Sequence, residues 1–143
     1  LKIYRCKGYT VASQGYIKRF GEPKSPEQLK SHQCICYSNL KQVTKWSYNH
    51  TNGTDSQVEV KAKLLCNSAS MELAMVLAGH GVCRLPEFVI ENALKDKKLA
   101  ILLSDYLAPT IDVYAIYPSR KHLSPKVRCF IDLLVEKMPT VTR

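Results

Sequence analysis

The chain has 143 residues, a length typical of one domain. Hydrophobic residues make up 45% and charged residues 23%, which excludes a disordered or fibrous chain. No apolar run approaches the roughly 18 residues that a membrane span requires. Lys and Arg number 21 against 12 Asp and Glu, so the formal net charge is +9, which suggests an anionic partner such as nucleic acid.

The positive charge lies at the two ends of the chain. Residues 31–117 are neutral overall, and the excess falls in residues 1–30 and 118–143. A basic nucleic-acid-binding module needs basic and aromatic residues along one face, so the neutral centre argues against that class. The chain opens at Leu1 without an initiator Met or the apolar core of a signal peptide. We therefore expect a fragment of a longer, cytoplasmic protein.

The first half of the chain alternates short helices and strands. Ser13 is a suitable N-cap for a short helix that Gly21 closes. Segment 25–28 combines an N-cap serine, a first-turn proline and a capping-box glutamine, and predicts a second short helix. Period-2 patterns and turn signals predict strands at 34–37, 46–48 and 58–66.

The second half continues the alternation. A helix of about eleven residues begins after Asn67 or Ser68 and ends at Gly79. It is apolar nearly all round, which predicts burial on two sides, either in the core or against another subunit. Strands are predicted at 82–85, 99–103 and 111–117, and helices at 86–94 and from 125 onward. Strands alternating with helices indicate an α/β domain.

The six cysteines are expected to be reduced thiols, because a chain of this length buries a core without disulfides. His32, Cys34 and Cys36 alternate, so in a strand they would share one face, as the ligands of a soft metal do. A fourth ligand at useful spacing is missing, and we predict no metal and no cofactor. The sequence contains neither a nucleophile elbow nor a phosphate loop, so we predict no enzymatic activity.

The junction between strand 58–66 and the following helix carries polar side chains. Asn67 and Ser68 stand at the helix N-terminus, where unpaired N–H groups and the helix dipole favour negative charge. Two roles of Asn67 and Ser68 stay open. They could form a binding site for a carboxylate, sulfate or phosphate group, or they could simply cap the helix. The same position favours a lowered pKa of the Cys66 thiol and redox sensing, whereas burial acts in the opposite direction.

Several segments resemble the LysR-type transcriptional regulators. Residues 77–86 match the signature "LAGxGVxxLP", and residues 113–132 resemble the end of the effector-binding domain almost word for word. Residues 11–16 resemble its "VASPxYL" junction, and residues 25–29 its "tPeDL" helix. Trp46 and Asn67 stand where that family has its hairpin tryptophan and its pocket asparagine. The resemblance covers residues 3–138.

The resemblance implies an α/β fold of the periplasmic-binding-protein-like (type 2) kind, with two subdomains. Residues 1–12 would be a crossing strand from the first subdomain. Residues 13–108 would form the complete second, effector-binding subdomain. Residues 109–143 would be the return strand and C-terminal helix of the first subdomain, of which the chain would hold only the C-terminal part.

The function implied by this resemblance is that of the effector-sensing domain of a bacterial LysR-type transcription regulator. A small organic or inorganic anion would bind in the cleft between the subdomains and control transcription through the geometry of a homodimer or higher oligomer. DNA would be contacted only through a helix-turn-helix domain absent from this chain, and no membrane is involved. The effector-binding residues carried over by position are Ser13, Cys66, Asn67, Ser68, Ala69, Leu85 and Pro86.

Two positions depart from the family pattern. Gln14 replaces the usual proline, and Arg84 stands where an aliphatic residue is usual, directed either to the cleft or to solvent. Strand 111–117 and the stripe beginning at Val127 lack sheet partners, so we expect exposed apolar surface and oligomerisation or partial disorder. The alternative function is an extracytoplasmic solute-binding protein of the same fold, against which the free cysteines argue.

Overall fold

A computed structural model describes residues 1–118 and 123–138, and the chain divides into two compact units. The larger unit is Lys7–Pro109, and the smaller joins Leu1–Cys6 to Thr110–Arg143. The subdomain boundaries expected at residues 13 and 108 remain predictions. Residues 119–122 of the resembling stretch 113–132 lie outside the described residues.

The larger unit is built on a mixed five-stranded sheet with the strand order β6-β3-β7-β2-β8. Its strands are β2 (Gly8–Ser13), β3 (Cys34–Tyr37), β6 (Ala62–Cys66), β7 (Val82–Pro86) and β8 (Leu99–Leu102). β3 pairs in parallel with β6 and β7, whereas β2 runs antiparallel to β7 and β8. The α/β prediction is therefore confirmed for this unit.

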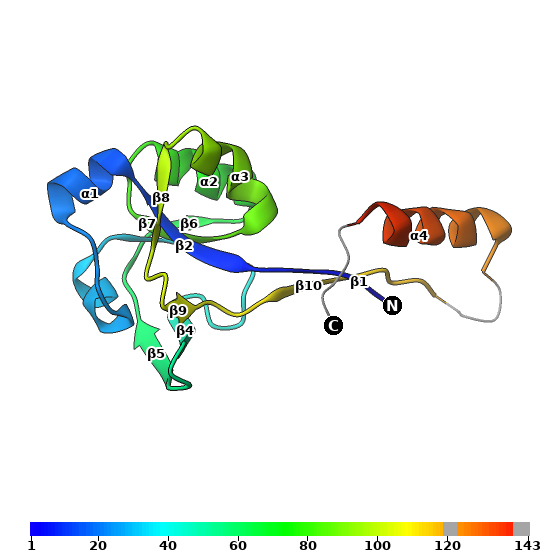
Figure 1. Cartoon of the computed structure of the whole chain (residues 1–143), viewed down its shortest axis with the longest axis horizontal. Coiled ribbons are helices and arrows are strands. Elements are labelled where there is room, and N and C mark those ends of the chain that lie inside the picture. Colours follow the sequence, from blue (N-terminus) through cyan, green and yellow to red (C-terminus); the bar gives the residue numbers. More distant parts are fainter. Residues whose placement is uncertain (119–122, 139–143) are drawn as a thin grey trace. The chain divides into compact units, whose positions relative to one another are not determined.

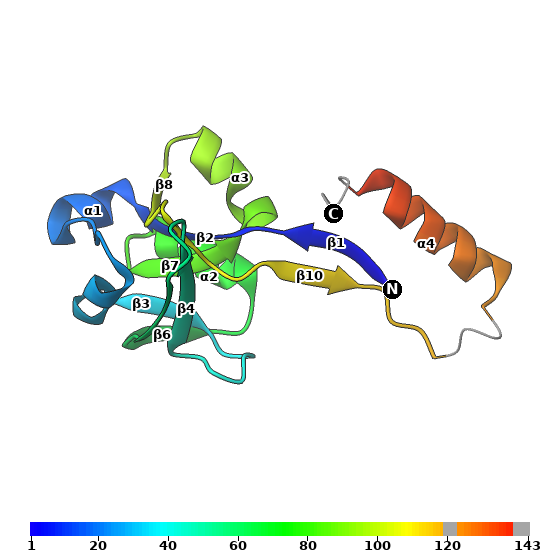
Figure 2. The same ribbon diagram turned by 60° about the horizontal axis from the view of Figure 1, so that its bottom comes forward.

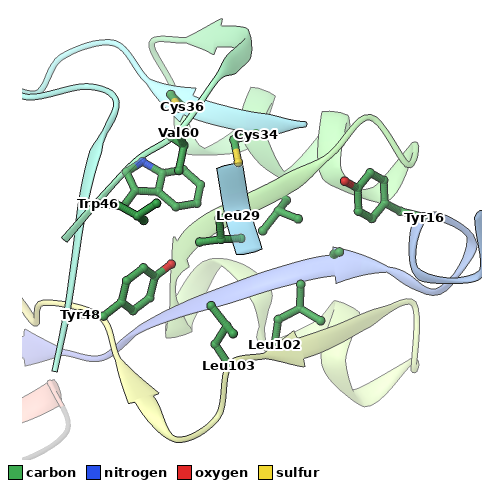
Figure 3. Packing of buried hydrophobic residues seen from close by; sticks show 12 residues of the cluster. Tyr16, Leu29, Cys34, Cys36, Trp46, Tyr48, Val60, Leu102 and Leu103 are labelled. Atoms are coloured by element: carbon green, nitrogen blue, oxygen red, sulfur yellow. The ribbon is translucent and has the colours of Figure 1, made fainter. Parts of the chain in front are cut away.

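Both faces of the sheet are covered (Figure 1). The helices α2 (Ala69–Leu77) and α3 (Glu87–Lys95) pack on one face. The other face packs against the sheet formed by β4 (Lys45–His50), β5 (Asp55–Glu59) and β9 (Tyr106–Leu107). Alternate residues of each strand enter the two cores, so Cys34 and Cys36 face Trp46 and Tyr48 (Figure 3), while Ile35 faces the helices.

The expected helix signals act as predicted at three positions. Ser13 Oγ accepts a hydrogen bond from Tyr16 N at 3.1 Å and caps α1 (Gln14–Phe20). Of the two candidate caps for α2, Ser68 fills the role, because its Oγ accepts from Met71 N at 3.2 Å. Gly79 follows α2 with φ at +83°, a conformation that favours glycine.

Two sequence predictions are wrong in detail. Segment 26–31 forms a 3-10 helix, η1 (Pro26–Ser31), without a capping box, since Gln28 Oε1 accepts from Lys24 N at 2.8 Å instead. The single strand predicted at 58–66 is two strands, β5 and β6, because the chain leaves the hairpin with β4 to pair with β3. Period-2 alternation continues through this change of sheet, so the pattern hides it.

Helix α2 is buried on one side only. Glu72 and Val76 are its buried residues, while Met71 is 49% exposed and Leu77 36% exposed. The prediction that the helix is enclosed within the core of this chain is therefore wrong, because its contacts with the central sheet and α3 leave Met71 and Leu77 exposed. Contact with another subunit stays a prediction.

The smaller unit contains a two-stranded ribbon and one helix. β1 (Lys2–Cys6) pairs antiparallel with β10 (Ile111–Tyr114), as Figure 2 shows. Helix α4 (Pro125–Lys137) has no buried residue, and Ile116 and Phe130 are 94% and 60% exposed. The expected exposed apolar surface is confirmed for this unit. The prediction that strand 111–117 lacks a sheet partner is wrong, because β1 pairs with it along Ile111–Tyr114. Within the described ranges, no helix has the length and apolar character of a bilayer span.

The close approach of Gly81 to β3 generates one stability prediction. A Cβ on Gly81 would lie 2.5 Å from Gln33 O, a backbone atom that also accepts from Val82 N. We expect Gly81→Ala to cost about 1–3 kcal/mol in the free energy of unfolding, measured in urea. Gly15→Ala is the matched control, since a Cβ there meets nothing within 4 Å and alanine favours the helix. Equal stability of the two variants would contradict this packing.

The buried carboxyl of Glu72 generates a second prediction. Glu72 is 4% exposed and accepts from Cys83 Sγ at 3.5 Å, and burial raises its pKa from 4.5 to about 7. Because the folded state favours the protonated form, stability is complete below the unfolded pKa and declines as the pH rises toward the folded pKa. We expect the wild type to lose about 2 kcal/mol more than Glu72→Gln between pH 5 and pH 8. Parallel pH profiles of the two proteins in urea unfolding would refute the assignment.

Candidate functional site

One edge of the central sheet collects the ends of several strands. Because β6, β3 and β7 are parallel, their last residues, Cys66, Tyr37 and Pro86, lie at the same edge. β2 runs in the opposite direction and begins there, with Gly8 opposite Pro86. This edge holds Cys66, Pro86 and the turn into α2, so most of the residues predicted for the effector site lie along it.

The start of α2 is open to solvent at this edge. Asn67 and Ser68 are exposed, and Ala69 is half-buried. Ser68 caps the N–H of Met71, while the first N–H groups of any helix lack partners inside it. The helix dipole adds a partial positive charge at this end. The turn formed by Asn67, Ser68 and Ala69 is therefore chemically suited to bind an anion as well as to cap the helix.

The Cys66 thiol is a buried group rather than a reactive thiolate. Its side chain is 6% exposed and packs with Val76 and Leu85. Burial, and then the neighbouring Glu72 carboxyl, raise the pKa of the thiol above its ordinary value. Burial thus acts against the lowered pKa that this helix terminus favours, and redox sensing by Cys66 stays a prediction.

Leu85 and Pro86 have different surroundings. Leu85 is 1% exposed and belongs to the core beneath α2 and α3, so it supports the edge from inside. Pro86 is half-buried and occupies the N-cap position of α3 (Glu87–Lys95). Of the two residues, Pro86 is the one that could contact a ligand bound at this edge of the sheet.

Ser13 is separated from the other predicted site residues. β2 is antiparallel to β7, so Ser13 ends its strand near the beginning of β7, at the opposite edge from Pro86. Its hydroxyl caps α1 and lies 3.4 Å from the position that a Cβ on Gly79 would occupy. Ser13 instead borders a surface groove of about 490 Å³ that Arg19 and Lys97 also line. A single site containing both Ser13 and Asn67 is not formed.

The sequence did not predict a cluster of aromatic side chains around one cation on the hairpin face, the face of the central sheet that packs against β4 and β5. Arg84 lies with its guanidinium carbon 4.8 Å from the Trp46 ring centre and 5.5 Å from that of Tyr48. Arg84 Nη1 donates to Ser47 O at 3.2 Å, and the hydroxyls of Thr10 and Tyr48 are 2.8 Å apart. Two features of the sequence could have indicated this cluster. They are the alternation of Trp46 with Tyr48 and the presence of a cation, Arg84, inside an apolar strand.

The alternating His32, Cys34 and Cys36 do not form a ligand set. His32 precedes β3, and its Nδ1 is hydrogen-bonded to Tyr16 Oη at 2.8 Å. Burial raises the pKa of Cys34 to about 12 and that of Cys36 to about 11, which keeps both thiols protonated. Residues 1–118 and 123–138 hold no group of three or more His, Cys, Asp or Glu that suits a metal ion.

Comparison with known sequences finds transcriptional regulators. An uncharacterized HTH-type transcriptional regulator of Haemophilus influenzae is 30% identical over 126 residues, covering 88% of this chain and 43% of that protein. The regulator PgrR of Escherichia coli is 31% identical over 131 residues, covering 89% of this chain and 43% of that protein. The chain thus spans about half the length of the curated relatives it matches, and these relatives are regulators rather than enzymes.

Solved structures show the same fold. The full-length Vibrio cholerae virulence activator AphB superposes with a TM-score of 0.83 and 26% identity, over 95% of this chain and 46% of that one. The regulatory domain of CrgA from Neisseria meningitidis gives a TM-score of 0.75 and 26% identity, over 96% and 67% of the two chains. The LysR substrate binding domain matches residues 1–139. This chain therefore belongs to the LysR family, as its substrate-binding regulatory domain.

Proposed function

We propose that the chain is the effector-sensing part of a cytoplasmic LysR-type transcription regulator and that its effector is a small anion. The observation that carries the proposal is the match of the LysR substrate binding domain to residues 1–139. The relatives with assigned roles are transcriptional regulators, which favours this function over an extracytoplasmic solute-binding protein.

The proposed division of the chain follows the family resemblance. Residues 13–108 form the second subdomain, and residues 1–12 and 109–143 belong to the connection with the first. The effector binds in the cleft between the subdomains and favours one of two arrangements of a dimer. That change in turn alters DNA binding by a helix-turn-helix domain outside this chain. The exposed Met71 and Leu77 of α2 are suited to the dimer contact.

The proposed anion site is the turn at the start of α2. The N–H groups of Ala69 and its neighbours, together with the side chains of Asn67 and Ser68, supply donors to the anion. Pro86 borders the site, while Cys66 and Leu85 support it from the core. Ser13 is omitted, since it ends β2 at the opposite sheet edge.

Ser68 and Ser13 provide a matched test, because each caps a helix of the larger unit through its hydroxyl. We expect Ser68→Ala and Ser13→Ala each to lower the free energy of unfolding by about 1 kcal/mol. Sulfate, phosphate or benzoate at constant ionic strength raises the Tm of the wild type and of Ser13→Ala. The same anion raises the Tm of Ser68→Ala much less, because the α2 turn has lost a donor.

The thermal-shift series has two results that contradict the proposal. One is the absence of stabilisation by any of the three anions. The other is an equal loss of anion-dependent stabilisation in Ser13→Ala and Ser68→Ala, which would show that capping alone is measured. In the complete regulator, a reporter gene should respond to the stabilising anion in Ser13→Ala and not in an Asn67→Ala, Ser68→Ala double variant.

A further inference from the structure

Arg84 is a half-buried cation between two sheets. It lies on β7, directly opposite Thr10 of β2, so both side chains point to the hairpin face. Trp46 and Tyr48 of β4, which are 2% and 1% exposed, fix the guanidinium through cation–π contacts. The hydrogen bond between Thr10 and Tyr48 holds the phenol ring in its place. The guanidinium is therefore held in one orientation before any ligand arrives.

The charge of Arg84 has no counter-charge among the described residues. Its polar contact there is Nη1 to Ser47 O, and the groups that interact with its charge are Tyr48 and three cysteines rather than carboxylates. Glu72 lies beside Cys83, on the helix face of the same strand. Burial lowers the pKa of Arg84, as expected for a cation without a partner. A buried unpaired charge destabilises a fold, so this residue is costly in the unliganded state.

Two donors of Arg84 are unused and are not fully buried. In the described part of the chain, Ser56 Oγ is the fully buried side-chain nitrogen or oxygen that lacks a partner. Nε and Nη2 of Arg84 have no acceptor among the described residues, and neither atom is fully buried, since the residue is half-buried. Nε and Nη2 form one edge of the guanidinium fork, which matches two oxygens of a carboxylate or sulfate group.

We propose that Arg84, oriented by Trp46 and Tyr48, binds an oxyanion group of a small ligand through Nε and Nη2. The inference rests on the proposed function, since the ligand is the anionic effector, and it identifies a side chain that recognises the effector's charge. Arg84 lies two residues before the end of β7, in the strand that ends at Pro86. The ligand class is a small carboxylate or an inorganic oxyanion.

The direct test follows the Arg84 Nε–Hε resonance of the full chain by NMR. Sulfate, phosphate and benzoate are titrated separately at constant ionic strength, with chloride as the reference anion, so that the arms separate inorganic oxyanions from carboxylates. We expect a saturable shift with at least one of the three. The absence of a saturable shift with all three would overturn the proposal without the need for any variant.

Substitutions separate ligand binding from structural stacking. Arg84→Met should weaken binding of the active anion at least about tenfold, because charge-assisted hydrogen bonds are lost. Arg84→Lys keeps the charge without the forked guanidinium, so its anion affinity should lie between those of Arg84→Met and the wild type. Arg19→Met is the matched control, since Arg19 also stacks on a ring, that of Phe20, at the protein surface. It should bind the anion like the wild type.

Thermal stability supplies the second readout. Removing an uncompensated cation while keeping the apolar stem should leave the Tm of Arg84→Met unchanged or raise it. A lowered Tm with wild-type anion affinity would show a purely structural stack and refute the proposal. Loss of binding in Ser68→Ala with wild-type binding in Arg84→Met would refute the role of Arg84 alone. Wild-type binding in both variants would refute the role of Arg84 and also the α2 site.

Discussion

The site depends on one constraint, the antiparallel course of β2 within a sheet whose other strands run the opposite way. Pairing of β2 with β7 and β8 completes the sheet and places Gly8 beside Pro86. The parallel strands β6, β3 and β7 then end together at the edge where α2 begins. Reversal of β2 also sends Ser13 to the far edge. The direction of one strand therefore decides which of the predicted residues share a site.

Strand β7 lies between two ionisable groups, Glu72 and Arg84, that have no counter-charge in the described part of the chain. Cys83 points to α2 and contacts the Glu72 carboxyl, while Arg84 points to β4 and stacks on Trp46. Because successive side chains of a strand face opposite sides, the sheet itself lies between the acid and the base. The raised pKa of the carboxyl favours its neutral form. A guanidinium remains charged at any physiological pH, and among the described residues Arg84 meets aromatic rings and the Ser47 carbonyl rather than a carboxylate.

Local signals in the sequence identified helix ends correctly at three positions. Ser13, Ser68 and Gly79 act through residues within one helical turn, and such contacts are readable from spacing alone. Strand direction and sheet membership depend on distant partners. For that reason the division of 58–66 into β5 and β6 could not be read from the alternation. The environment of Arg84 was equally hidden, since it depends on Trp46, distant in sequence and brought near by folding.

The most direct test of the account is a map of backbone amide shifts in the full chain during titration with sulfate and with benzoate. The amides of Ala69 and Ser70, at the start of α2, should shift with saturation at the same anion concentration. Those of Gln14 and Gly15, at the start of α1 on the opposite edge, should stay unchanged. Saturable shifts at Gln14 and Gly15 with unmoved amides at Ala69 and Ser70 would contradict the account.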